Sequence, residues 1–222
     1  MIARVKSIFN QNGYVLYTKP YQLNVVGMRS ENTIPNKFDD EIHAFYMTDA
    51  GTWNYHIYKA TTDPGTFWLE NPYTPEGTAI LAQGQYINAY AIGMHRGLYP
   101  ALVQVGTVSF IRDYNRDAIL DFNNGQKVTG SGFGINIHRA NATGTTKTVD
   151  LNSAGCQVFQ NADDFAEFMQ LCYQHDKLYG NKFTYTLIDF RSVKRETKRR
   201  IVIGGSAVCA LALAFTIHYS IN

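Results

Sequence analysis

The stretch Gly134-Ile135-Asn136-Ile137-His138 predicts a central strand, because apolar and polar side chains alternate along it. The two isoleucines share one face of such a strand, so the side chain of His138 points to the opposite face. Fifteen residues after this histidine comes Ser153-Ala154-Gly155-Cys156, in which a thiol directly follows a glycine. We expect the imidazole and the thiol to meet in one cleft.

Further segments rich in β-branched and aromatic residues predict more strands, separated by turn-forming residues. Asp49-Ala50-Gly51 is typical of a hairpin turn between strands over residues 41–47 and 53–59. Because strands do not alternate with helices, we expect a mainly β fold built on an antiparallel sheet or sandwich. The other expected strands cover residues 15–17, 22–26, 66–69, 89–94, 101–105, 107–111 and 184–188.

One amphipathic helix is predicted after Cys156. Asn161 is a suitable N-cap, two aspartates follow it in the first turn, and Gly180 marks the end. Four apolar side chains recur at helical spacing, so this face should pack against the sheet and hold the cysteine loop. These residues are Phe165, Phe168, Met169 and Cys172.

Cys156 is the candidate nucleophile of a thiol enzyme. A nearby imidazole can accept the proton of a thiol, which leaves the reactive thiolate, and His138 is the candidate base. Gly155 permits a tight turn, and we expect its amide or that of Cys156 to face an oxyanion. Ser153 is expected to orient the loop by bonding nearby backbone. The alternative is that Cys156 is a small buried apolar side chain.

His95 and Arg96 form a second candidate constellation, because they follow the expected strand over residues 89–94 and can line the same cleft. A guanidinium there would hold a substrate carboxylate through two hydrogen bonds. Arg139, the neighbour of His138, has a similar status as a substrate-binding candidate. The alternative for both arginines is a solvated side chain.

The order and spacing of His138 and Cys156 resemble those of the L,D-transpeptidase catalytic domain (YkuD-like) family, whose signature is a histidine followed by Ser-His-Gly-Cys. The segment Ala60-Thr61-Thr62-Asp63-Pro64-Gly65-Thr66-Phe67 is similar to the family's Thr-Pro-x-Gly-x-Phe strand entry. The resemblance thus extends over most of residues 1–190. Two positions depart from it: Ala154 stands in place of the motif histidine, and Val158 in place of an arginine that grips a substrate carboxylate.

The resemblance implies an enzyme that acts on murein stem peptides without a cofactor. Cys156 would form a thioester with the acyl group of a diamino-acid residue, and His138 would accept the thiol proton. Water would then hydrolyse the thioester, whereas an amine would form a cross-link. The alternatives are a membrane-anchored structural protein with an inactive fold of this type, a cellular L,D-transpeptidase, and a cysteine peptidase or amidase acting on another amide.

The charge distribution argues against nucleic acid as a partner, because residues 1–190 carry a net charge of −3. His43 and His56 occur in aromatic-rich strands without a second zinc-ligand motif, so we expect packing rather than a metal site.

The C-terminal residues 201–221 contain no Asp, Glu, Lys or Arg and follow a strongly basic segment, residues 191–200. This pattern predicts a membrane-spanning helix over residues 201–222 behind a basic linker; a buried core helix is the alternative. With no signal peptide expected at the N-terminus, a cytoplasmic body would be separated from murein. One interpretation is a lytic enzyme in the internal membrane of a bacterial virus, where the tail helix allows contacts with a second copy or with virion proteins.

Overall fold

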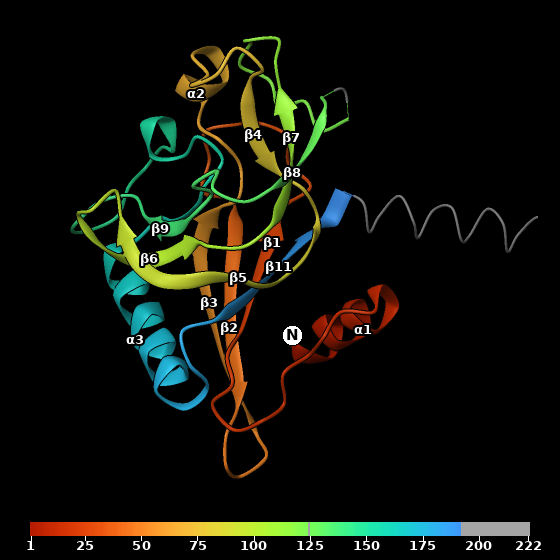
Figure 1. The fold of residues 1–222 in the computed structure, drawn as a ribbon, viewed down its shortest axis with the longest axis vertical. Helices are drawn as coiled ribbons and strands as arrows, with labels where there is room; N and C mark the ends of the chain where they lie inside the picture. The colour runs from red at the N-terminus through yellow and green to blue at the C-terminus, as the bar shows by residue number, and fades with distance from the viewer. Residues whose placement is uncertain (124, 192–222) are drawn as a thin grey trace, which may run out of the picture. The chain divides into compact units, whose positions relative to one another are not determined.

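A computed structural model describes residues 1–123 and 125–191 of the chain. The chain divides into a compact unit, Met1–Ile188, and a second unit, Asp189–Asn222, of which three residues are described. Figure 1 shows the elements of the first unit. Its helices are α1 (Ile2–Asn12), α2 (Thr66–Glu70), the 3-10 turn η1 (Asp150–Asn152) and α3 (Ala162–Tyr179).

Eight strands close into a barrel in the order β1-β11-β5-β6-β9-β10-β3-β2. Their bounds are β1 (Asn24–Arg29), β2 (Asp40–Met47), β3 (Trp53–Thr61), β5 (Gly84–His95), β6 (Tyr99–Gln104), β9 (Ile137–Arg139), β10 (Gln157–Phe159) and β11 (Phe183–Asp189). The prediction of a mainly β fold is confirmed, and most printed strand pairs are antiparallel as expected, but the sheet closes into a barrel and is not a sandwich. Both architectures bury one face of each strand, so alternation along the sequence does not distinguish them.

The barrel contains a parallel strand pair, β9 with β10. These strands run in the same direction with His138 opposite Val158, whereas the β1–β2, β2–β3, β3–β10, β5–β6, β5–β11 and β6–β9 pairs are antiparallel. A parallel pair needs a long crossover, and residues 140–156 supply it. This pairing brings the segment before His138 beside the loop that ends at Cys156.

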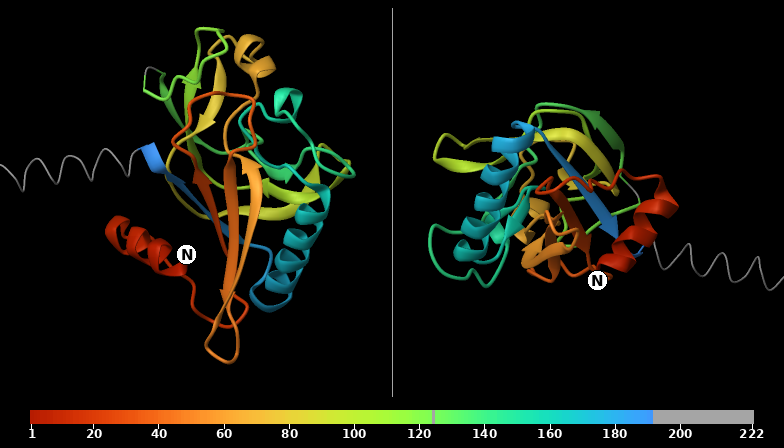
Figure 2. Two further views of the ribbon diagram at one scale, coloured as in Figure 1. Left: turned by 180° about the vertical axis from the view of Figure 1, so that it is seen from behind. Right: turned by 90° about the horizontal axis from the view of Figure 1, so that it is seen from below.

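A separate three-stranded sheet has the order β4-β7-β8, with bounds β4 (Thr78–Leu81), β7 (Val108–Asp113) and β8 (Lys127–Gly130). Figures 1 and 2 show this sheet and α2 at the end of the molecule away from the β2–β3 turn. The β2–β3 hairpin itself is as predicted, since the two strands pair antiparallel across the turn at Asp49-Ala50-Gly51. The small sheet supplies one wall of the site described below.

Helix α3 confirms the amphipathic helix predicted after Cys156. The side chain of Asn161 accepts hydrogen bonds from the N–H groups of Asp163 (2.7 Å) and Asp164 (3.1 Å) at its N-terminus. Its apolar face is buried and packs around Phe159 of β10. Figure 2 shows the helix running along one side of the barrel, so it supports the strand that follows the cysteine.

Two strand predictions were wrong, and a third was only partly right. Thr66–Glu70 forms helix α2 because Gly65 begins a helical turn there and Leu69 is buried against Ile80 and Leu120. Residues 15–17 form no strand, and the strand predicted over residues 134–138 is limited to β9. Helix α1 was missed, although its buried residues Val5, Ile8 and Phe9 have helical spacing.

The basic linker over residues 192–200 and the helix expected over residues 201–222 lie outside the described residues. Within the described part, no helix is long and apolar enough to cross a membrane. At the start of the second unit, the guanidinium of Arg191 pairs with the carboxylate of Asp189.

Candidate active site

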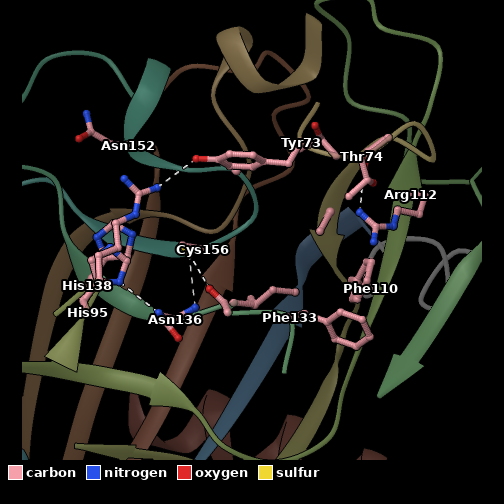
Figure 3. Close-up of a pocket in the computed structure, with 17 residues that line it drawn as sticks. Tyr73, Thr74, His95, Phe110, Arg112, Phe133, Asn136, His138, Asn152 and Cys156 are labelled. Carbon is pink, nitrogen blue, oxygen red and sulfur yellow. Dashed lines mark hydrogen bonds between the residues drawn. The ribbon is translucent and has the colours of Figure 1, made fainter. Parts of the chain in front are cut away.

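A cavity of about 440 Å³ contains both Cys156 and His138 in its lining. Its walls come from the β5–β6 turn, the three-stranded sheet, the segment before β9 and the cysteine loop (Figure 3). The polar and reactive residues that line it are Tyr73, Thr74, Thr78, His95, Arg96, Arg112, Asn136, His138, Asn152 and Cys156. The structure therefore places the predicted nucleophile and the predicted base in one cavity.

The thiol of Cys156 is half-buried and contacts two backbone groups of the neighbouring segment. Its Sγ donates to the carbonyl of Gly134 (3.4 Å) and accepts from the N–H of Asn136 (3.4 Å). Burial raises the pKa of this thiol above its ordinary value, while the Asn136 N–H and the charge of Arg96 oppose that rise. The resting side chain is therefore a neutral thiol at pH 7.

His138 is a buried neutral imidazole with one ring nitrogen already occupied. Its Nδ1–H donates to the carbonyl of Arg139 (2.8 Å), which also accepts a hydrogen bond from the Tyr99 hydroxyl (3.1 Å). The neutral ring then carries its lone pair on Nε2, the nitrogen that can accept a proton. Burial, followed by the neighbouring His95, lowers the pKa of His138 to about 3.

No hydrogen bond joins Sγ of Cys156 to His138 among the described residues, because the thiol is bonded to Gly134 and Asn136 instead. Catalytic hydrogen bonds are often long or poorly aligned without substrate and tighten when it binds. If His138 accepts the thiol proton, Sγ would first have to turn away from the Gly134 carbonyl.

His95 contacts His138, and Asn136 contacts Cys156. The ring of His95 stacks on that of His138, with centroids 4.0 Å apart and an interplanar angle of 22°. The side-chain amide of Asn136 donates to Nδ1 of His95 (3.1 Å), and its Oδ1 accepts from the N–H of Gln104 (2.9 Å). Asn136 thus links the thiol, through its backbone N–H, to the histidine pair.

The sequence prediction missed Asn136, although it lies within the run that predicts the strand. Two further lining residues were missed, Tyr73 and Arg112. Each belongs to a segment far from the cysteine loop in the sequence, so only the packing of the three-stranded sheet and its loops against the barrel reveals them.

Ser153 and Gly155 lie under the cavity rather than in its lining. The hydroxyl of Ser153 donates to the carbonyl of Cys156 (2.8 Å) and accepts from the N–H of Gly155 (3.2 Å). Ser153 therefore orients the loop as expected. Of the two amides expected to face an oxyanion, that of Gly155 is bonded to Ser153, whereas the N–H of Cys156 has no partner among the described residues.

Gly155 is required by close packing. Its φ of +118° lies in the region that favours glycine, and an added Cβ would lie 2.5 Å from the carbonyl oxygen of Ala79. A second close approach occurs at Gly65, whose N–H donates to the carbonyl of Ser153 (2.9 Å) and whose Cβ would clash with the backbone of Asp150. These two contacts hold the cysteine loop against β4 and the start of α2.

The two predicted substrate-binding arginines have different environments. Arg96 lines the cavity, and its guanidinium donates to the hydroxyl of Tyr73 (3.4 Å). Arg139 lies outside that lining, over the ring of Tyr99 at 4.4 Å, in a neighbouring groove that also contacts His138. The cavity therefore contains Arg96 but not Arg139.

The two departures from the L,D-transpeptidase pattern have distinct structural outcomes. Val158 is fully buried and packs with Phe38 and Val149, so its side chain does not reach the cavity. Ala154 lines the cavity, so a methyl group stands there in place of the motif imidazole.

The described residues contain no group of three His, Cys, Asp or Glu side chains that could hold a metal ion. No protein-family model, curated protein or solved structure matches this chain. Support for a function therefore comes from the geometry of the cavity and from the residues of the motif.

Proposed function

We propose that this protein is a cysteine acyl-transfer enzyme that acts on murein stem peptides, with Cys156 as nucleophile and His138 as base. The observation that carries the proposal is the shared cavity, whose lining contains both a partly accessible thiol and a neutral imidazole. The murein substrate rests on the resemblance of the His138 and Cys156 motif to the L,D-transpeptidases.

In the first step, Sγ of Cys156 attacks the carbonyl carbon of the substrate while Nε2 of His138 takes the thiol proton. Burial disfavours both the thiolate and the imidazolium, so proton transfer accompanies attack instead of preceding it. The resting enzyme is then a thiol–imidazole pair and not an ion pair.

The negative charge that develops on the carbonyl oxygen needs hydrogen-bond donors. The N–H of Cys156 is the best candidate, because it has no partner among the described residues while that of Gly155 is bonded to Ser153. A single donor of this kind contributes about 3 kcal/mol to transition-state stabilisation.

Collapse of the tetrahedral intermediate breaks the carbon–nitrogen bond and leaves a thioester on Cys156. His138 returns its proton to the leaving amine, which departs neutral. Water activated by the same imidazole then releases the acyl group as a carboxylic acid, or an amine acceptor takes it as a new amide. We propose hydrolysis as the main outcome, on the hypothesis that a bacterial virus delivers the enzyme to the wall on a membrane.

The second candidate is a membrane-anchored structural protein with an inactive enzyme fold. The observation that favours it is the buried Val158, which stands where an arginine would contact the substrate. A cysteine peptidase or amidase that cleaves another amide is a third possibility with the same nucleophile and base.

The test is product analysis by mass spectrometry after incubation of defined muropeptides with intact protein, with Cys156→Ala and with Cys172→Ala. Cys172 is the matched control, since it is a buried thiol on α3 outside the cavity. We expect a thioester adduct on Cys156 and cleaved or cross-linked product with the intact protein and with Cys172→Ala. Equal product from Cys156→Ala would overturn the proposal, and no product from any of the three would favour the structural protein.

A further inference from the structure

The cavity around Cys156 carries positive charge without compensating carboxylates. Among the described residues that line it are two arginines, Arg96 and Arg112, and no Asp or Glu. Residues 1–190 carry a net charge of −3, so this lining has the opposite sign to the body around it. A cleft lined by one sign of charge focuses the electric field and concentrates ligands of the other sign. The ligand of this cavity should therefore be an anion.

Arg112 is held in place by groups that leave its charge intact. Its guanidinium donates to the carbonyl of Gly77 (2.8 Å) and lies over the ring of Phe110 at 4.7 Å. The exposed acid Glu76 interacts with Arg112 but is not part of the lining. The pKa of Glu76 is lowered by hydrogen bonds to its own N–H and to Thr74, and to a smaller extent by Arg112.

The two arginines act at different ends of the cavity. The charge of Arg96 contributes to lowering the pKa values of His95 and His138, so Arg96 lies at the histidine end. Figure 3 shows Arg112 beside Phe110 on the opposite side, with Cys156 between the two ends. A ligand with two negative groups would thus span the thiol.

The proton path decides which end holds the leaving group. His138 must reach the leaving amine to protonate it, so this part of the substrate occupies the end with Arg96. The acyl part, which stays on Cys156 as the thioester, extends toward Arg112. We infer that Arg112 is a specificity-determining residue that binds a carboxylate on the acyl part, while Arg96 binds the terminal carboxylate of the leaving group.

This inference rests on the proposed function for the orientation of the substrate, but binding alone can test it. The probes are three murein tetrapeptides: one whose diamino-acid residue bears a side-chain carboxyl, one with lysine in its place, and one with a C-terminal amide. Their affinities for the full-length Cys156→Ala protein are measured by calorimetry. The measurement is repeated with proteins that carry Arg112→Gln or Arg96→Gln in addition to Cys156→Ala. No turnover is needed.

We expect the carboxyl-bearing peptide to bind about tenfold or more tightly than the lysine peptide, because a charge-assisted pair is lost with lysine. Arg112→Gln should abolish this preference and retain the preference for a free C-terminus. Arg96→Gln should do the reverse. Lys127→Gln, which removes an exposed cation from β8 of the same sheet, should change neither.

Equal affinity for the carboxyl and lysine peptides, or a preference that survives Arg112→Gln, would overturn the inference, as would failure of all three peptides to bind. The proposed function fails separately, if intact protein forms no thioester with a peptide that binds. A preference that also disappears in Lys127→Gln would show a general effect of surface charge and would likewise refute the role of Arg112.

Discussion

At the scale of single residues, the environment of Cys156 sets the reactivity of its thiol. Its sulfur lies between the Asn136 N–H and the Gly134 carbonyl, and burial raises its pKa. The imidazole of His138 has its pKa lowered to about 3, so it gives no positive charge to stabilise a thiolate near pH 7. In the proposed mechanism, proton transfer therefore accompanies attack.

The pH dependence of alkylation follows from this state. In the Cys172→Ala protein, the rate of iodoacetamide labelling of Cys156 should keep rising through pH 9, because the thiolate forms only above the ordinary thiol pKa. The measurement is the initial labelling rate by mass spectrometry between pH 5 and 10. A plateau already reached at pH 7 would show a preformed ion pair and contradict the prediction.

Replacement of His138, the proposed base, should affect thioester formation and alkylation of Cys156 differently. His138→Gln should lower the rate of thioester formation by about 10²- to 10⁴-fold, which is the usual contribution of a positioned general base. Alkylation of Cys156 at pH 9 should change little, because His138 does not pair with the resting thiol. Arg139→Gln removes a neighbouring cation outside the cavity lining and tests whether loss of charge alone has the same effect.

Gly155 gives a stability prediction at the same scale. Gly155→Ala combines a φ of +118° with a Cβ placed 2.5 Å from the Ala79 carbonyl, so the loop must move. We expect a loss of about 2 kcal/mol or more in the free energy of unfolding, measured with urea. Gly144→Ala is the control, because Gly144 also has positive φ but open space around its Cβ. An equal loss in both variants would assign the effect to φ and not to the close approach.

At the scale of elements, α3 is the support of the cysteine loop, and its N-terminus depends on one side chain. Asn161→Ala removes the hydrogen bonds to the N–H groups of Asp163 and Asp164 and should cost about 1 kcal/mol of stability. Asn161→Asp retains a hydrogen-bond acceptor, and its negative charge interacts favourably with the positive end of the helix dipole. This variant should therefore recover most of the lost stability. Urea unfolding of the three proteins measures the difference; no recovery with aspartate would point to the Thr145 contact instead.

Local patterns predicted α3 and the β2–β3 hairpin because both depend on neighbours in the sequence: a cap with an apolar stripe, and a turn with flanking strands. The same logic failed for Thr66–Glu70, where β-favouring side chains form α2 because Leu69 is buried against two distant residues. Local propensity is a weak prior that tertiary packing overrides.

Some residues of the candidate site could likewise be predicted from the sequence, and others could not. His138 and Cys156 were named from motif spacing, and the parallel pairing of β9 with β10 brings their segments together. Arg112 and Tyr73 were not predicted, because their approach to the thiol depends on how the three-stranded sheet and its loops pack against the barrel. No spacing along the chain carries that information.

At the scale of the whole molecule, the burial of four histidines makes the free energy of unfolding depend on pH. Burial lowers the pKa values of His43, His95, His138 and His175, so the fold favours their neutral forms. When folding lowers the pKa of a histidine, its contribution to stability is fully present above the pKa of the unfolded state, about 6.5. That contribution is lost as the pH falls toward the pKa of the folded state.

We therefore expect the free energy of unfolding to fall between pH 6.5 and about pH 3, as measured by urea denaturation across that range. His138→Gln should flatten the slope, because its pKa of about 3 makes it a large contributor. Asp113 acts in the opposite sense, since burial raises its pKa to about 6 and its protonation at low pH favours the fold. An unchanged slope in His138→Gln would contradict the assignment.

The last strand of the barrel also supports the loop that carries Cys156. Tyr185 of β11 donates to the side chain of Gln157 (2.8 Å), which in turn donates to the carbonyl of Gly155 (3.2 Å). β11 lies between β1 and β5 in the closed barrel, so the brace beneath the nucleophile comes from the far end of the described chain. A ribosome-bound fragment that ends before β11 lacks this brace, so the loop that carries Cys156 gains its full support only after β11 has been synthesised.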